Sequence, residues 1–93
     1  MSYKITNYTK ARARKLGVIV KPSTRKGKKI DVFSKDGKKL ASIGALNMMD
    51  FPNWKIAKGI KFAKERQRLY KIRHQKTRTK VGTPSYYADQ LLW

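Results

Sequence analysis

The chain of 93 residues contains no cysteine, a single histidine and only five acidic residues. The absence of cysteine excludes disulfides, thiolate metal sites and cysteine nucleophiles. His74 alone cannot complete a zinc site built from nitrogen and sulfur ligands within one chain. No run approaches the roughly 20 apolar residues that a membrane-spanning helix needs, and residues 1–15 lack the apolar region of a secretory signal. We therefore expect no metal, no cofactor and no transmembrane segment.

The few acidic residues also argue against catalysis. None of them is spaced as a catalytic carboxylate pair, and the five are Asp31, Asp36, Asp50, Glu65 and Asp89. Neither of the glycine-rich phosphate-binding motifs GxGxxG and GxxxxGK[ST] occurs. Ser85, His74 and Asp89 supply the residue types of a serine-nucleophile triad, but no motif supports that interpretation. The sequence therefore predicts no catalytic residue, no small-molecule substrate and no enzyme.

Positive charge is what the chain has in excess. Its 24 lysines and arginines give a formal net charge of +19 at pH 7. Such a chain repels itself and attracts polyanions within a Debye length, which is about 8 Å at physiological salt. The alternative, a solvated surface that only maintains solubility, leaves this self-repulsion uncompensated. We expect a negatively charged partner: nucleic acid, acidic protein surfaces or an anionic membrane surface.

Enough apolar material is present for a folded domain. Hydrophobic residues make up 40% of the chain and aromatic residues 11%, which is too apolar for a disordered basic tail. The length predicts a single small basic domain over residues 1–93. We expect an α+β fold. A small antiparallel sheet of two or three strands would pack with an N-terminal helix, a long basic helix and a short C-terminal helix.

The first half of the chain predicts a helix followed by strands. A helix over residues 6–17 would be capped by Thr6 or Asn7 and end at Gly17, with Tyr8, Ala11 and Leu16 on its inner face. Residues 18–44 form the strand and hairpin region, and Asp36-Gly37 is typical of a two-residue type I′ turn. That turn would pair Phe33 with Leu40, Val32 with Ala41 and Ile30 with Ile43, placing the latter four residues on one apolar face.

The second half predicts helices. A helical region over residues 50–76 would begin near Asp50, with Gly59 breaking or kinking it. From Ile60 on, the helical spacing places four residues on one inner stripe: Phe62, Arg66, Leu69 and Arg73. Ala63, Tyr70 and the stem of Gln67 lie beside this stripe. A C-terminal helix over residues 84–93 would follow a cap at Thr83.

The basic residues form candidate contact clusters along the whole chain. The candidates for polyanion or partner contact are Lys10, Arg12, Arg14, Lys15, Arg25, Lys26, Lys28, Lys29, Lys35, Lys38, Lys39, Arg68, Lys71, Arg73, Lys76, Arg78 and Lys80. Because the charge surrounds the domain and no helix-turn-helix, zinc-finger, RRM or KH signature is present, any nucleic-acid binding would be through phosphates and without sequence preference.

Aromatic and apolar residues offer possible anchors. Trp54 and Trp93 could insert into a neighbouring subunit, and an exposed patch of Met48, Met49 and Phe51 could do the same. Aromatic residues at helical spacing are more often core residues. Tyr86, Tyr87 and Trp93 could alternatively stack on bases.

Two stretches in the second half carry a resemblance to known proteins. They read Arg66-x-x-x-Tyr70-x-x-Arg73-His74 and Gly82-x-Pro84-x-Tyr86-Tyr87-Ala88-Asp89-x-Leu91-Leu92-Trp93. With Thr9-Lys10-Ala11-Arg12-Ala13, Gly17-Val18, Lys21-Pro22 and the hairpin running into Gly44, the chain resembles a family of small basic proteins encoded by large DNA viruses of algae and protists. The resemblance covers nearly the whole chain and supplies no catalytic residues.

The resemblance implies a viral setting, in which some such proteins are minor structural components of the virion. We therefore expect a minor capsid protein of the cement type, assembled in the infected host cell, that binds acidic surfaces of major and minor capsid proteins. The alternative is a nucleic-acid-binding protein of the virion or virus factory without sequence specificity. Other roles, including binding of RNA in the manner of ribosomal proteins, remain open.

Overall fold

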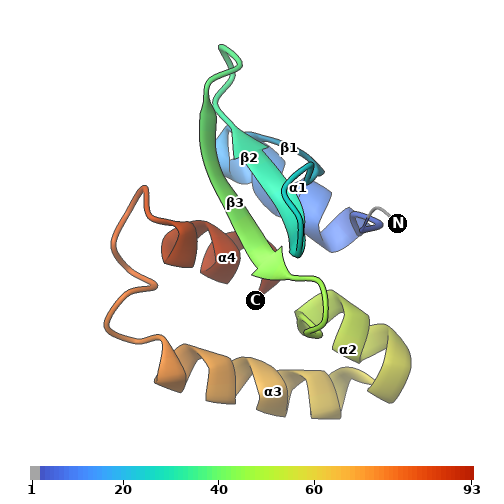
Figure 1. Cartoon of the computed structure of the whole chain (residues 1–93). Helices are drawn as coiled ribbons and strands as arrows, with labels where there is room; N and C mark the ends of the chain where they lie inside the picture. The colour runs from blue at the N-terminus through green and yellow to red at the C-terminus, as the bar shows by residue number, and fades with distance from the viewer. Residues whose placement is uncertain (1–2) are drawn as a thin grey trace.

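The computed structural model describes residues 3–93 and confirms the α+β class. Its elements are α1 (Asn7–Leu16), β1 (Ile19–Pro22), β2 (Lys28–Phe33), β3 (Lys39–Ala45), α2 (Phe51–Lys58), α3 (Ile60–Arg73) and α4 (Pro84–Leu92). The strands form one antiparallel sheet in the order β1-β2-β3, so the sheet has three strands. Figure 1 shows α4 between the sheet and α3, and α1 next to β1.

The helices begin where the sequence predicts. Thr6, Asp50 and Thr83 each stand in extended backbone, and each side chain accepts a hydrogen bond from the backbone N–H three residues later. These bonds satisfy donors that a helix start otherwise leaves free. Gly59 breaks the predicted 50–76 region into two helices, and the second ends at Arg73 rather than at residue 76.

The hairpin turn differs from the predicted type I′ turn. Gly37 has a φ of 91°, but no other residue in the turn has a positive φ, which a type I′ turn requires at two positions. Three residues therefore form the loop, and Ser34 N–H donates to the Lys38 carbonyl at 2.8 Å. The extra residue is absorbed by a bulge at Leu40, so that Phe33 pairs with Lys39 instead of Leu40.

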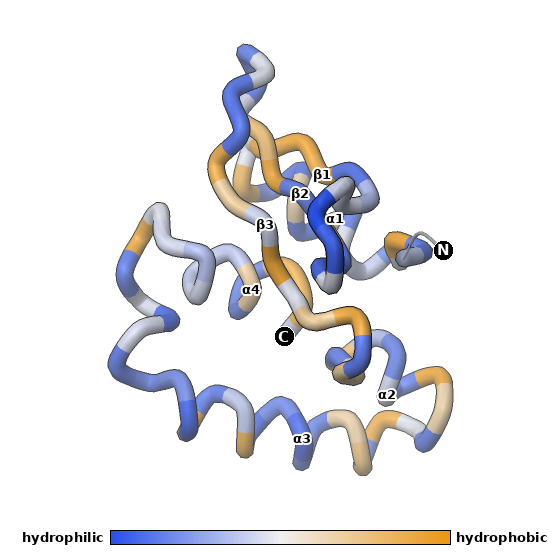
Figure 2. The backbone as a smooth tube through the Cα atoms, in the orientation of Figure 1, coloured by the Kyte–Doolittle hydropathy of each residue, from blue (hydrophilic) through white to orange (hydrophobic). Residues whose placement is uncertain are grey.

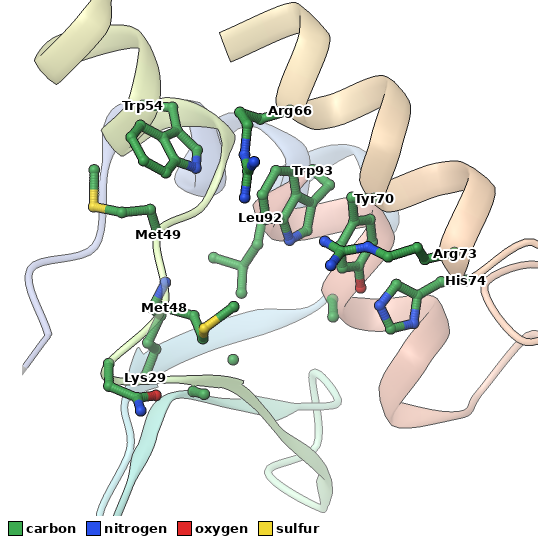
Figure 3. A pocket seen from close by; sticks show the side chains of 14 residues that line it. Lys29, Met48, Met49, Trp54, Arg66, Tyr70, Arg73, His74, Leu92 and Trp93 are labelled. Atoms are coloured by element: carbon green, nitrogen blue, oxygen red, sulfur yellow. The ribbon is translucent and has the colours of Figure 1, made fainter. Parts of the chain in front are cut away.

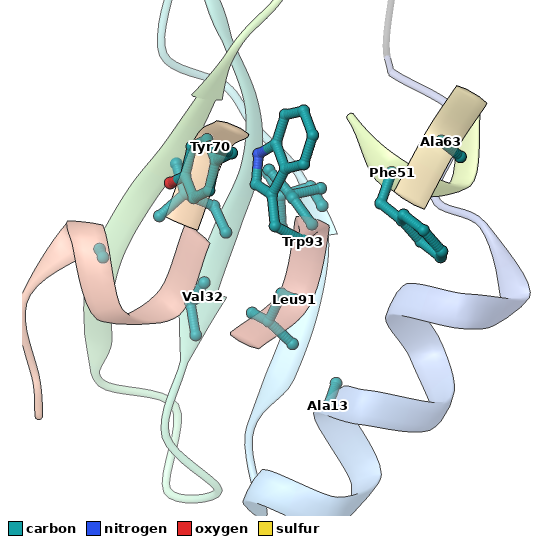
Figure 4. Close-up of a cluster of buried hydrophobic side chains, with 11 residues drawn as sticks. Ala13, Val32, Phe51, Ala63, Tyr70, Leu91 and Trp93 are labelled. Atoms are coloured by element: carbon teal, nitrogen blue, oxygen red, sulfur yellow. The ribbon is translucent and has the colours of Figure 1, made fainter. Parts of the chain in front are cut away.

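Beyond the bulge the predicted register is confirmed. Ile30 pairs with Ile43 and Val32 with Ala41, and all four side chains are buried on one face of the sheet. Leu91 and Leu92 of α4 complete this core (Figure 4). The sheet face therefore buries its apolar residues against the C-terminal helix, as the alternation of side chains along a strand requires.

Two predicted helix faces are only partly correct. In α1, Tyr8 and Leu16 pack against the core as predicted, but Ala11 is exposed. Thr9 is buried in its place, and its hydroxyl donates to the Leu91 carbonyl at 2.8 Å. In α3, only Ala63 and Tyr70 are buried, while the stripe residues Phe62 and Arg73 are exposed and Leu69 is half-buried. The two buried residues of α3, Ala63 and Tyr70, are seven residues apart and lie on the same side of the helix. Only this side of α3 is buried in the domain, and much of the rest of the helix surface is exposed to solvent.

Candidate functional site: a basic surface and an aromatic pocket

Each buried carboxylate in the domain is held by groups of the same chain. Asp50, 0% exposed, accepts from Lys29 Nζ at 2.9 Å and from the Tyr3 hydroxyl at 2.7 Å. Asn53 donates its backbone N–H to the other oxygen of Asp50 at 3.1 Å. Burial and the Asp50 carboxylate raise the pKa of the Tyr3 hydroxyl. One carboxylate therefore joins β2, the start of α2 and the segment before α1.

Asp31 on β2 forms a second centre, on the sheet face opposite the core. The Ser23 and Ser42 hydroxyls donate to its Oδ1 at 2.6 and 2.7 Å, and Lys39 Nζ lies 3.5 Å from Oδ2. Burial alone would raise the pKa of Asp31. The hydrogen bonds from Ser23, Ser42 and the Thr24 N–H outweigh it and, with the Lys39 charge, lower the pKa to about 2.

Asp89 on α4 forms the third centre. Its two oxygens lie 2.8 Å from Lys71 Nζ of α3 and 3.6 Å from an Arg78 guanidinium nitrogen in the loop between α3 and α4. Burial and the negative charge of Asp89 raise the pKa of Tyr70 to about 12. The remaining acids are exposed and act locally: Glu65 pairs with Arg68, and Asp36 accepts from Ser34 in the hairpin turn.

This internal use of every carboxylate leaves most cations without an acidic partner. Five of the 24 lysines and arginines pair with a carboxylate within residues 3–93, which leaves 19. Of these 19, three are half-buried (Arg12, Lys28 and Arg66), and the others are exposed. The net charge of the domain is therefore presented almost entirely to its surroundings.

Most of the predicted contact residues lie on this surface. Exposed and without an acidic partner in residues 3–93 are Lys10, Arg14, Lys15, Arg25, Lys26, Lys35, Lys38, Arg73, Lys76 and Lys80. Lys29 corrects the prediction of an exposed contact residue, because its side chain is 3% exposed and its ammonium group is bound to the buried carboxylate of Asp50. Four others are engaged by carboxylates of the same chain, namely Lys39, Arg68, Lys71 and Arg78.

Tertiary structure brings two of the predicted clusters together. A Cβ placed on Gly17, at the end of α1, would stand 3.7 Å from Lys35 Cε in the hairpin tip. Arg14 and Lys15 occupy the last turn of α1, beside the same glycine. The basic residues of α3 and of the loop after it lie elsewhere, and Figure 2 shows hydrophilic stretches both at the hairpin tip and along α3. Exposed cations therefore occur on α1, the β1–β2 loop, the hairpin tip, α2 and α3, whereas α4 carries none.

A pocket of about 510 Å³ opens where the C-terminal helix, α3 and the β3–α2 connector meet (Figure 3). It is lined by Lys29, Gly44, Ala45, Asn47, Met48, Met49, Trp54, Arg66, Tyr70, Arg73, His74, Ala88, Leu92 and Trp93. Arg66, Tyr70 and Arg73 are spaced i, i+4, i+7 and therefore lie along one side of α3. Aromatic rings, methionine side chains and two guanidinium groups thus border one space.

The aromatic residues of the pocket are ordered by stacking. Tyr70 stacks on Trp93, with ring centroids 4.4 Å apart and planes 7° apart, and on His74 at 4.2 Å. Trp93 is 9% exposed, so the proposed external anchor packs in the domain's own core. Trp54 is half-buried, and its ring centroid lies 4.9 Å from that of Phe62. The guanidinium carbon of Arg66 lies over the Trp54 ring, 5.4 Å from the ring centroid.

Sequence reasoning missed part of this site. Arg66 lies on the predicted stripe with Arg73, but the sequence gives no sign that both border a pocket with Trp54, Trp93 and the two methionines. The predicted patch of Met48, Met49 and Phe51 is also only partly correct. Both methionines are exposed, but Phe51 is buried beneath Tyr8, with ring centroids 5.3 Å apart.

Metal-binding clusters and membrane-spanning helices are absent from the described residues. Within residues 3–93, no group of three or more histidine, cysteine or acidic side chains is arranged to hold a metal ion. None of the helices in that range combines the length and the apolar character needed to cross a membrane. Comparison of the chain with protein-family models, with curated proteins and with solved structures gives no match.

Proposed function

We propose that this domain binds nucleic acid through its phosphates, without reading base sequence. The observation that carries the proposal is the internal use of the buried acidic residues. Asp31, Asp50 and Asp89 are neutralised inside the fold, and the two exposed acids, Asp36 and Glu65, are engaged by Ser34 and Arg68, so none of the remaining 19 cations forms an ion pair with a carboxylate in residues 3–93. The closely spaced phosphates of a duplex provide a matching density of negative charge.

The distribution of the cations supports binding without sequence preference. They lie on α1, the β1–β2 loop, the hairpin tip, α2 and α3, rather than on one element that enters a groove. Phosphate contacts position a protein on nucleic acid but carry no sequence information. Several faces of one small domain can therefore engage different strands, which suits a protein that packs or coats nucleic acid.

The test is the salt dependence of binding. The protein should bind labelled duplexes of unrelated sequence with equal affinity, measured by fluorescence anisotropy between about 50 and 300 mM salt. The logarithm of the affinity should fall linearly with the logarithm of the salt concentration, by about 0.9 for each phosphate neutralised. Absence of binding at about 50 mM salt would overturn the proposal, because phosphate contacts are strongest there.

Matched variants sharpen this test. Arg25→Gln combined with Lys26→Gln removes two exposed cations from the β1–β2 loop, and the slope should decrease by up to about two units. Glu65→Gln combined with Arg68→Gln removes an exposed ion pair and keeps the net charge, so the slope should not change. Equal slopes for both double variants would show that the loop makes no phosphate contact.

A second candidate is the minor capsid role that the viral resemblance implies. The observation that favours it is a set of exposed apolar side chains around the β3–α2 connector and the α2–α3 junction. Leu46, Met48, Ile56 and Ile60 are 45%, 54%, 78% and 43% exposed. Exposed apolar surface of this kind is typical of protein interaction sites. If the chain fastens capsid proteins, virus particles emptied of their nucleic acid should retain it, and its loss with the nucleic acid would exclude this role.

A further inference from the structure

We propose that the aromatic pocket binds one unstacked nucleotide of a single-stranded nucleic acid, with its phosphate on Arg66 and Arg73. This inference rests on the proposed function and goes beyond it, because a purely electrostatic surface would not distinguish single strands from duplexes. It also assigns a ligand class to a cavity that phosphate contacts on the outer surface leave unused.

The size of the pocket suits such a ligand. Its volume of about 510 Å³ lies within the range of roughly 300–1,000 Å³ that small-molecule sites occupy. A base inside a duplex is covered by its stacked neighbours and cannot enter a pocket, whereas a base in a single strand can be splayed out. The cavity therefore selects for single-stranded regions or ends.

The walls of the pocket supply the two kinds of contact that a nucleotide needs. The half-buried ring of Trp54 provides aromatic surface for a base. Tyr70 and Trp93 stack on each other and line the pocket as largely buried rings, and the flexible side chains of Met48 and Met49 provide an adaptable opposite wall. In Figure 3 the side chains of Arg66 and Arg73 extend from α3 into the region between these walls.

The two arginines are free to bind a phosphate. Neither forms an ion pair with a carboxylate in residues 3–93, whereas Lys71 on the same helix is held by Asp89. Guanidinium groups bind phosphate oxygens through paired hydrogen bonds and also stack on aromatic rings. Arg66 already lies over the Trp54 ring at 5.4 Å, so its planar group is oriented at the edge of the site.

The first experiment compares equal charge losses inside and outside the pocket. Arg66→Gln with Arg73→Gln is matched by Lys61→Gln with Lys64→Gln, two exposed residues of the same helix that do not line the cavity. The pocket variant should lose at least about fivefold more affinity for a short oligothymidylate than the matched variant, because it removes the guanidinium hydrogen bonds to the phosphate of the bound nucleotide. Both variants should lose duplex affinity equally. Equal losses on the single strand would overturn the inference.

A second pair of variants tests the apolar wall. Met48→Glu places a carboxylate opposite Arg66 and Arg73, whereas Leu46→Glu makes the same charge change two residues away, outside the pocket. Both positions are exposed, so both variants should fold. Only Met48→Glu should weaken oligothymidylate binding beyond its effect on duplex binding. Equal effects of the two substitutions would count against the pocket.

Indole fluorescence provides a direct readout, because Trp54 and Trp93 both line the cavity. Adenosine monophosphate should quench the fluorescence at concentrations at which inorganic phosphate does not. Identical behaviour of the two would mean that only an anion site exists and no base site. Failure of the two proposals can be told apart: if the native protein binds duplexes but the variant pairs do not differ, only the pocket inference fails. If it binds neither nucleic acid, the proposed function fails.

Discussion

The ammonium group of Lys29 lies 2.9 Å from the carboxylate of Asp50, and both side chains are almost completely buried. The pair joins β2 to the first turn of α2 across 21 residues of sequence. Asp50 also caps α2 by accepting the Asn53 N–H. In a domain whose unpaired cations are mostly exposed, this buried contact fixes the connector that borders the pocket.

Removing one member of this pair should be costly. Asp50→Asn keeps a capping side chain but leaves Lys29 charged and buried, so the free energy of unfolding should fall by about 3–5 kcal/mol. Adding Lys29→Met to that substitution should restore much of the loss, because no unpaired charge then remains inside. Urea denaturation measures both variants. A double variant as unstable as the single one would show that the charge balance is not what the pair supplies.

The low pKa of Asp31 predicts a specific loss of stability in acid. Its pKa is about 2 in the folded chain against 3.8 for an ordinary aspartate, so its contribution is complete above pH 3.8 and disappears as the pH falls toward 2. This contribution amounts to about 2 kcal/mol. Asp31→Asn should therefore show a shallower decline of unfolding free energy over that range than the native chain. Glu65→Gln, which alters an exposed pair, serves as the control and should leave the decline nearly unchanged.

The two tryptophans should contribute unequally to stability. Trp93→Ala removes a buried side chain that stacks on Tyr70, and it should lower the free energy of unfolding by about 3–5 kcal/mol. Trp54→Ala, at the half-buried rim of the pocket, should cost clearly less. Thermal and urea denaturation of the two variants decide this. Equal costs would mean that Trp54 is more deeply packed than the structure places it.

Gly44 is required for the close approach of α4 to β3. It has a φ of 76°, and an added Cβ would stand 2.8 Å from Leu92 Cδ1 and 3.0 Å from Lys29 Cδ. Gly44→Ala should therefore destabilise the domain by about 1–3 kcal/mol more than backbone strain alone. Gly27→Ala is the control, since its φ of 81° is equally unfavourable for alanine but no atom lies within 4 Å of the added Cβ. Melting temperatures that fall equally in both variants would contradict the steric argument.

Self-repulsion among the outward-facing cations predicts that salt stabilises the fold. Raising sodium chloride from about 20 to about 300 mM shortens the Debye length and should raise the melting temperature. An added polyphosphate should raise it further, because a ligand that binds the folded chain more tightly than the unfolded chain stabilises it. A melting temperature indifferent to both would show that the excess charge does not strain this domain.

Local signals in the sequence predicted the elements well because each signal acts over a few residues. Thr6, Asp50 and Thr83 cap helices by reaching the backbone three residues ahead, which needs no information from the rest of the chain. The apolar alternation likewise fixed the core face of the hairpin. The turn type was wrong because Asp36 does not take the positive φ of a type I′ turn, and a compensating bulge restores the same core register.

The amino-acid sequence by itself determined the charge, the absence of thiol chemistry, the order of the elements and the alternating core face of the sheet, because these follow from composition and short-range geometry. Only the tertiary structure decided which cations are neutralised and which face outward. It buried Lys29 against Asp50, joined Asp89 to Lys71, and placed the indole of Trp93 against Tyr70. Such pairings join residues far apart in the chain, and the free energy of a charge or a ring depends on its burial and its neighbours, which a linear pattern does not specify.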